Sequence, residues 1–257
     1  MQSTVTLTFG DQAENHAGMQ RIGKMADSGF DYNDLVQAKA KFEAIGCECE
    51  IIDLVNNYVA KKYNATPAYV LIIRNAIDKI LSEGADGMFT EQNSLVPDKK
   101  AFMYGRVVNK NARHNLCFDE KGQKADYEKG KGTIVSYDKV PLLSKLRDKL
   151  SDYLGEKAKG LTVEGNYYYD IHQTGVSFHG DAERRKVVAV RLGATIPLHY
   201  HWFKDSKPIG KRIKLSFDHG DMYVMSEKAS GFDWKLRSIQ TLRHSAGAKK
   251  FLELKKK

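Results

Sequence analysis

From about residue 86 to the C-terminus, the sequence is a succession of short apolar runs, rich in β-branched and aromatic residues and separated by Gly, Asn and Lys. Examples are LTVEGNYYYDIH, KVVAVRLGATIPLHYHWF and KRIKLSFDHGDMYVMS. Runs of this length and composition are typical of β-strands, and many short strands in succession favour a barrel or a sandwich. The pattern therefore predicts a β-rich core over residues 86–257, interrupted by one helix at 140–155.

The first 85 residues have a different pattern of apolar residues. A strand rich in Thr and Val is predicted at 3–9, and the spacing of apolar residues predicts a helix at 31–46. A second helix is predicted at 66–84, where Thr66 can cap the first turn and apolar residues recur every three or four positions. We therefore expect residues 1–85 to form a mostly helical N-terminal region in front of the β-rich core. The predicted fold class is α+β.

Composition restricts the setting in which the chain works. No run approaches eighteen consecutive apolar residues, so no membrane span is predicted, and the N-terminus MQSTVTLTFG lacks the pattern of a signal peptide. Three cysteines are too few for a disulfide framework and suit a reducing, intracellular location, cytoplasmic or nuclear. The net charge of +9 favours polyanionic partners such as nucleic acid. Nothing in the sequence indicates the oligomeric state.

The stretch SFHGDAERRKVVAVRLGA places an imidazole and a carboxylate two residues apart, just before an apolar run. On a strand, residues i and i+2 face the same way, so His179 and Asp181 can point into one cavity. His244, in TLRHSAG, is the candidate third ligand of a 2-His-1-carboxylate site, which is typical of Fe(II) oxygenases. A surface turn explains the same two residues without a metal. His199 and His201 share a strand face and are either alternative metal ligands or residues that fill the core or line a cleft.

The order of elements around these residues narrows the interpretation. After HGD come the strand VVAVRLG, the strand ATIPLHYHWF, the segment HGDMYVMS, the segment RHSAG and a short run edged by lysines. Over residues 164–257 this order resembles the Fe(II)- and 2-oxoglutarate-dependent dioxygenases, in particular the AlkB-type branch. The resemblance implies a double-stranded β-helix, or jelly-roll, core that binds Fe(II) and 2-oxoglutarate. It implies His179, Asp181 and His244 as the iron ligands, and oxidation of a substrate C–H bond, including the N-methyl groups of nucleic-acid bases.

The resemblance also suggests which residues bind the cosubstrate. The family has a tyrosine ahead of the metal-binding motif that contacts 2-oxoglutarate, and the NYYYD stretch offers Tyr167, Tyr168 and Tyr169. The family also has arginines on its last strand, but only lysines follow His244 here. A lysine lacks the bidentate fork with which arginine binds a carboxylate. The predicted cosubstrate-binding residues are therefore Tyr168 and Tyr169, with Lys249, Lys255 or Arg191 as the carboxylate anchor.

Other residues are candidates for contact with the substrate. Glu183 matches an acidic position that contacts the substrate base in AlkB, and the segment 104–118 interleaves Arg106 and Arg113 with aromatic residues. Such a segment is either a lid over a nucleotide or a solvated basic hairpin. The loop GDQAENHAGMQRIG gathers Asp11, Glu14 and His16, which form a second site, contact a partner or belong to an ordinary capped loop.

Two alternative functions stay open at this point. The same core could hydroxylate protein side chains, and a metal-free jelly roll could simply bind nucleic acid. The missing arginine after His244 keeps the metal-free alternative open.

Overall fold

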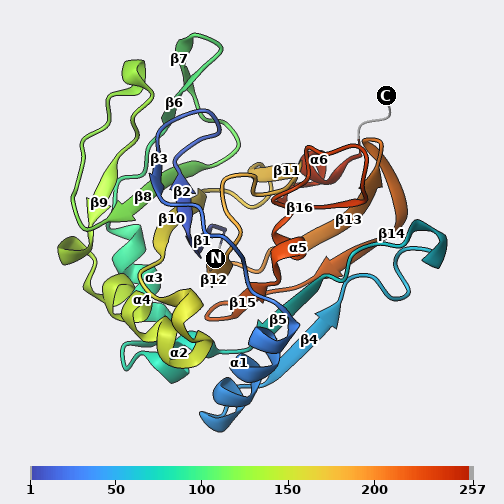
Figure 1. Cartoon of the computed structure of the whole chain (residues 1–257). Coiled ribbons are helices and arrows are strands. Elements are labelled where there is room, and N and C mark those ends of the chain that lie inside the picture. The colour runs from blue at the N-terminus through green and yellow to red at the C-terminus, as the bar shows by residue number, and fades with distance from the viewer. Residues whose placement is uncertain (1, 255–257) are drawn as a thin grey trace.

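The computed structural model describes residues 2–254 and contains two main β-sheets (Figure 1). Within this range, no helix is both long enough and apolar enough to span a bilayer. Strand pairs are antiparallel except for β8–β9. The larger sheet has the strand order β4 (Cys49–Asp53), β5 (Tyr69–Ile73), β15 (Met222–Met225), β12 (Val187–Gly193), β1 (Thr4–Gly10), β10 (Thr162–Tyr168), β8 (His114–Asp119) and β9 (Ile134–Ser136). The smaller sheet has the order β11 (Gly175–His179), β16 (Thr241–Gly247), β13 (Leu198–Lys204) and β14 (Lys207–Leu215).

The remaining elements lie around these sheets. Two short hairpins stand apart from them, β2 (Gln12–Glu14) with β3 (Arg21–Gly23), and β6 (Lys100–Met103) with β7 (Arg106–Asn109). The helices are α1 (Tyr32–Ala44), α2 (Ala76–Ile80), α3 (Gly84–Asn93), α4 (Pro141–Leu154), α5 (Glu227–Ser230) and α6 (Lys249–Leu252). The α+β class predicted from the sequence is confirmed, and so is the helix predicted at 140–155, which forms α4.

The apolar residues of the larger sheet divide between its two faces because strand side chains alternate. On β1, Val5, Leu7 and Phe9 join the buried leucines of α4 and the apolar face of α1 in one cluster. The opposite face of this sheet packs against the smaller sheet, where Tyr200 and Trp202 of β13 belong to a second cluster. The fold is therefore layered as helices, large sheet and small sheet, and the threonines of β1 face the space between the sheets.

The prediction that residues 1–85 are mostly helical is wrong. This region contributes β1, β4 and β5 to the larger sheet, and β1 lies between β10 and β12, so one sheet crosses the expected boundary at residue 85. The helix predicted at 66–84 is instead β5 followed by the short α2, and the backbone turns at Asn75, which has a φ of 51°. The run YVLII suits a strand because its β-branched residues pack well on a pleated surface. Pairing with β4 and β15, which no local pattern reveals, decides its conformation.

Candidate metal centre

The three predicted metal ligands converge at one end of the smaller sheet. His179 ends β11 and lies directly opposite His244 of β16 in the antiparallel register, while Asp181 stands in the turn after β11. The Asp181 Oδ1 atom lies 3.6 Å from His179 Nε2 and 3.5 Å from His244 Nε2. One ligand atom from each residue lies within 4.8 Å of the others. Two imidazole nitrogens and one carboxylate oxygen, all on one side of the point where a metal ion would lie, suit a 2-His-1-carboxylate site with open coordination positions.

Hydrogen bonds and burial prepare these residues to bind a metal. The Nδ1 atom of His179 lies 2.8 Å from the carbonyl of Ser177 and 3.1 Å from that of His244. Carbonyl oxygens only accept hydrogen bonds, so Nδ1 carries the hydrogen and Nε2 keeps its lone pair for a metal. Burial, helped by the nearby His244, lowers the pKa of His179 to about 4. Burial opposes ionisation of Asp181, but His244, Arg184 and His179 together outweigh it and hold the Asp181 pKa well below its usual value. A neutral imidazole and an ionised carboxylate are the forms that bind metals.

The residue between His179 and Asp181 has to be a glycine. A Cβ atom at Gly180 would lie 2.0 Å from the carbonyl oxygen of Gly231 and 2.8 Å from the Cβ of Trp234. The carbonyl of Ser230, just before Gly231, accepts a 3.0 Å hydrogen bond from the Asp181 amide. The segment 230–234, which leads from α5 towards β16, therefore packs directly on the metal-binding turn and fixes its position.

The three ligands face a cavity of about 390 Å³ between the two sheets. This volume lies within the range of small-molecule sites. Its inner wall consists of side chains from β1, β10 and β12, including Thr6, Tyr168 and Arg191. Arg191 is only 1% exposed, and its Nε and Nη1 atoms have no hydrogen-bond partner in the protein. A buried guanidinium with free N–H groups is costly unless an anion pairs with it, so this wall is suited to bind a carboxylate.

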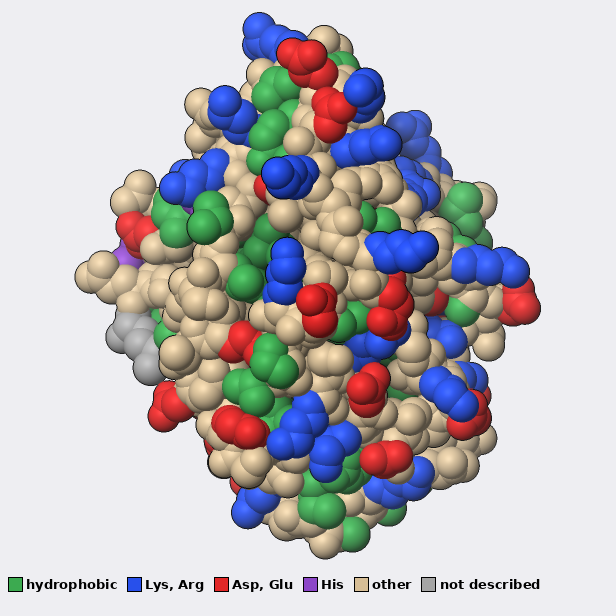
Figure 2. All heavy atoms as spheres, turned by 90° about the vertical axis from the view of Figure 1, so that its left-hand side faces the viewer, with side chains coloured by type: hydrophobic (Ala, Val, Ile, Leu, Met, Phe, Trp, Pro, Cys, Tyr) green, Lys and Arg blue, Asp and Glu red, His purple; other side chains and the backbone are tan. Residues whose placement is uncertain are grey.

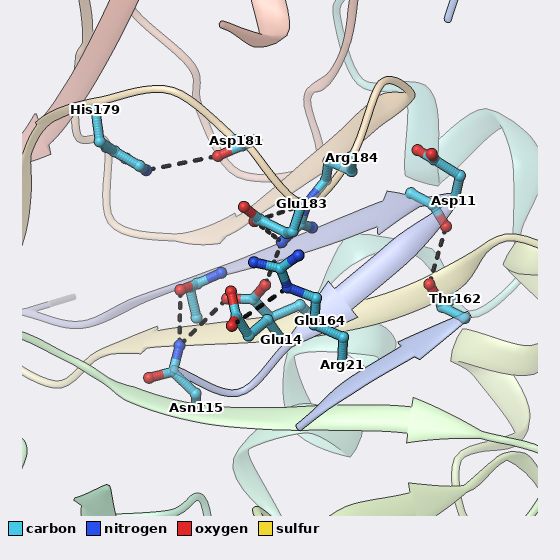
Figure 3. Close-up of polar contacts among 12 residues, drawn as sticks. Asp11, Glu14, Arg21, Asn115, Thr162, Glu164, His179, Asp181, Glu183 and Arg184 are labelled. Carbon is cyan, nitrogen blue, oxygen red and sulfur yellow. Dashed lines mark hydrogen bonds and ion pairs between the residues drawn. The ribbon is translucent and has the colours of Figure 1, made fainter. Parts of the chain in front are cut away.

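A network of charged side chains lines the cavity on the side of β2 and β10 (Figure 3). Arg184 is 3% exposed and pairs with Glu164 and, at 2.7 Å, with Glu183. Glu14 of β2 lies 3.4 Å from Arg21 at the rim. Burial raises the pKa of Glu183, which lines the cavity as predicted but is already paired with Arg184. Sequence reasoning did not identify Arg184, although its buried pairing positions Glu183.

The three tyrosines of NYYYD lie in three different environments. Tyr168 is 5% exposed and lines the cavity, as predicted. Tyr167 points to the other face of the sheet, where its hydroxyl donates to Gln92 at 2.9 Å. Tyr169 is 46% exposed, stacks on His114 and donates to the carbonyl of Asn111, so its prediction as a cosubstrate ligand is wrong. Side chains alternate along β10, so Tyr167 and Tyr168 point to opposite faces of the sheet. Tyr169 lies just beyond the end of the strand.

The predicted basic anchors also separate. Lys249 is exposed at the start of α6 and not on a strand, so it does not reach the cavity; Lys255 lies outside the described residues. Of the predicted carboxylate anchors among residues 2–254, only Arg191 lies in the cavity wall.

The two arginines predicted to contact the substrate also separate. Arg113 lines the cavity, and its Nε donates to Asn166 of β10, whereas Arg106 is exposed on the β6–β7 hairpin.

His199 and His201 do not join the metal centre. Their neighbour on β13, Tyr200, faces the cavity side and lies 5.7 Å from the His244 ring, so alternation turns both histidines to the outer face of the smaller sheet. Glu14 and His16 lie at the rim of the cavity, so the loop that carries them contacts the site. Sequence reasoning missed Thr6, Asn166 and Trp234, which line the same cavity. Alternation on β10 could have indicated Asn166, which shares a face with Tyr168.

Comparison with known proteins gives a relative that carries no functional name. No family model matches the sequence. The chain is 42% identical, over 256 residues, to a protein of Acanthamoeba polyphaga mimivirus described as uncharacterized. The alignment covers 98% of this chain and 99% of the mimivirus protein. The two proteins therefore correspond along nearly their whole length.

Proposed function

This chain belongs to the family of that mimivirus protein, and we propose that it is an Fe(II)- and 2-oxoglutarate-dependent dioxygenase of the AlkB type. The observation that carries the proposal is the convergence of His179, Asp181 and His244, with one ligand atom of each within 4.8 Å of the others. The ligands face a cavity whose wall holds the buried guanidinium of Arg191, with its Nε and Nη1 atoms free of hydrogen-bond partners in the protein. A metal beside an anion-binding wall is the arrangement that this cosubstrate needs.

The strand arrangement supports a double-stranded β-helix as the core. From β10 onward the chain alternates between the sheets except at the β13–β14 hairpin, with β10, β12 and β15 in the larger sheet and β11, β13, β14 and β16 in the smaller. A jelly roll has eight strands in two sheets, so one more strand is needed in the larger sheet. We assign β1 to this place, between β10 and β12 and antiparallel to both. The N-terminal strand β1 would then take the position that the last strand of the chain takes in other dioxygenases of this type.

This assignment explains why no arginine follows His244. The strand in the last position is β1, and its cavity-facing residues Thr6 and Thr8 carry no charge. Arg191 stands directly beside Thr6 in the register of β12 with β1. Its guanidinium therefore takes the place of an arginine on the last strand and binds the distal carboxylate of 2-oxoglutarate.

The chain's own residues then have separate roles. His179, Asp181 and His244 hold the metal and leave positions open towards the cavity. Arg191 and Tyr168 orient the cosubstrate from the inner wall. Bound Fe(II), with 2-oxoglutarate and dioxygen as co-substrates, would supply the oxidation of a substrate C–H bond, with succinate and carbon dioxide as the by-products.

An N-methylated nucleic-acid base is the proposed substrate. Glu183 and Arg113 line the cavity, held by Arg184 and Asn166, and would contact the base and its phosphate from these positions. Figure 2 views the molecule from the side of β8 and β9, where Lys and Arg side chains are spread out with acidic residues among them. This mixed surface favours contact between the substrate and the cavity rim over binding along this face.

The proposal predicts a visible absorption band. Anaerobic addition of Fe(II) and 2-oxoglutarate to the metal-free protein is expected to produce the weak metal-to-ligand charge-transfer band of the bound pair. His179→Ala removes one ligand and is expected to abolish the band while the protein stays folded by circular dichroism. Absence of the band in the wild-type protein, with both additives in excess, would overturn the proposal.

Succinate release identifies the substrate class. Formation of succinate in air is expected to increase when a methylated single-stranded oligonucleotide is added, and not with its unmethylated counterpart or with a peptide mixture. Stimulation by peptides alone would show a protein hydroxylase on the same core instead.

A further inference from the structure

The outer face of the smaller sheet, which points away from the cavity, carries a concentrated set of basic and aromatic side chains. The register places His201 of β13 beside Arg243 of β16, and His199 beside Ser245 on one side and Lys214 of β14 on the other. Paired residues of antiparallel strands share a face, so these side chains lie together. We call this surface the outer basic face; its residues are Phe178, His199, His201, Phe203, Arg212, Lys214, Arg243 and Ser245.

The positive charge of this face is not neutralised by the protein. Among residues 2–254, none of Arg212, Lys214 and Arg243 forms an ion pair with an acidic side chain. The charges that act on His199 and His201 come from Arg212 and Lys214, and all of them are positive. Such a field attracts anions.

Aromatic rings hold two of the guanidinium groups in place. The Cζ atom of Arg243 lies 4.1 Å from the Phe203 ring centre, and that of Arg212 lies 5.3 Å from the Phe178 ring centre. Contacts of this kind are favourable and keep a long side chain in one orientation. An anion that binds these groups therefore finds them already ordered, which reduces the entropic cost of binding.

Several polar atoms of the same face have no partner. His199 and His201 are 8% and 7% exposed, and the Nδ1 atom of each lacks a hydrogen-bond partner in the protein. The same holds for Oγ of Ser245, which is fully buried, and for Nε of Arg243. Native proteins satisfy most buried polar groups, so the concentration of unsatisfied groups sets this face apart from an ordinary packed surface.

Protection of a sheet edge explains only part of this pattern. Edge strands often carry lysines that prevent pairing with other chains, and β14, with its exposed Lys207 and Lys211, is such an edge. Arg243 lies on β16, an inner strand between β11 and β13, where this function is not needed.

The outer basic face is continuous with the mouth of the cavity. The Arg243 guanidinium also lies 5.2 Å from the ring centre of Trp234, and Trp234 lines the cavity. A chain molecule that crosses the outer face along Arg212 and Arg243 therefore arrives at the opening in front of the metal ligands.

We propose that the outer basic face binds the phosphate backbone of single-stranded nucleic acid and leads the strand to the cavity. Arg212 and Lys214 of β14 and Arg243 of β16 lie on either side of β13, so their cationic groups can contact successive phosphates of a flexible strand. The inference deepens the proposed nucleic-acid substrate, but the binding itself needs neither iron nor 2-oxoglutarate.

The test measures binding to the metal-free protein in EDTA by fluorescence anisotropy, with a labelled single-stranded oligonucleotide of about 12 nucleotides. Arg212→Glu combined with Lys214→Glu reverses two exposed charges of the face. Loss of two phosphate contacts is expected to raise Kd at least tenfold and to lower the slope of log K against log salt by about 1.4. The matched control is Lys121→Glu with Lys139→Glu, two exposed residues outside the outer face and the cavity, which make the same change in net charge.

Equal weakening by the test and control pairs would overturn the proposal, because the effect would then come from net charge alone. Binding of an acidic peptide that is as tight, and as sensitive to the test pair, would also overturn it. If the protein binds the oligonucleotide but forms no Fe(II)–2-oxoglutarate band, the proposed enzymatic function is overturned and the proposed binding surface stands.

Discussion

Gly180→Ala is expected to lower the affinity of the protein for Fe(II) by about a hundredfold, although the substitution removes no ligand. The new Cβ atom would lie 2.0 Å from the Gly231 carbonyl oxygen, a backbone atom that cannot rotate away. Either the turn that carries His179 and Asp181 or the segment 230–234 must move. The second of these leads into β16, which carries His244. In both cases the three ligands lose their common geometry.

Isothermal titration with Mn(II), which resists oxidation, measures this loss of affinity directly. The strain is also expected to reduce the free energy of unfolding by roughly 1–3 kcal/mol, as overpacking does elsewhere. Gly122→Ala is the matched control, since a Cβ atom there meets its nearest neighbour at 3.4 Å, an ordinary contact. Metal affinity in Gly180→Ala within twofold of that in Gly122→Ala would show that the loop does not fix the metal-binding turn.

Arg191→Met is expected to weaken binding of 2-oxoglutarate by about two to four orders of magnitude and to leave metal affinity unchanged. The guanidinium can donate two charge-assisted hydrogen bonds, each worth roughly 1.5–3 kcal/mol, and each 1.4 kcal/mol corresponds to about tenfold in affinity. Methionine keeps the apolar stem and removes the charge. The dependence of the charge-transfer band on 2-oxoglutarate concentration measures the effect.

The same substitution is expected to stabilise the protein in the absence of ligands. Arg191 is buried with its Nε and Nη1 atoms unpaired, so the ligand-free protein carries the cost of a desolvated charge. Its replacement by an apolar residue of similar volume is expected to raise the free energy of unfolding by about 1–4 kcal/mol. Chemical denaturation of the metal-free protein checks this, with Arg106→Met on the exposed β6–β7 hairpin as the control. Unchanged cosubstrate affinity in Arg191→Met would place the carboxylate anchor elsewhere.

Local patterns in the sequence were sufficient to select His179 and Asp181 as candidate metal ligands. The H-x-D spacing predicts that the two face the same way on a strand, whereas Asp181 follows the strand end and the turn at Gly180 brings its carboxylate to His179. The convergence of His244 on them was expected from the order of the elements, and the register of β11 with β16 produces it. Helix α4 was equally predictable, because its leucines recur at helical spacing and its first residue is a proline.

Contacts between residues distant in sequence decided the rest. A pattern of apolar residues says which face of a strand is buried, but not which strand lies beside it. The placement of β1 between β10 and β12, the conversion of a predicted helix into β5 and the choice among three adjacent tyrosines all depend on such partners. Arg191 becomes the candidate anchor only because β12 lies next to a β1 strand that carries threonines. The sequence alone therefore determined which residue types serve as candidate metal ligands. The tertiary structure decided which side chains form the cavity around them. The reason is that pairing energy between distant strands exceeds the conformational preference of any short segment.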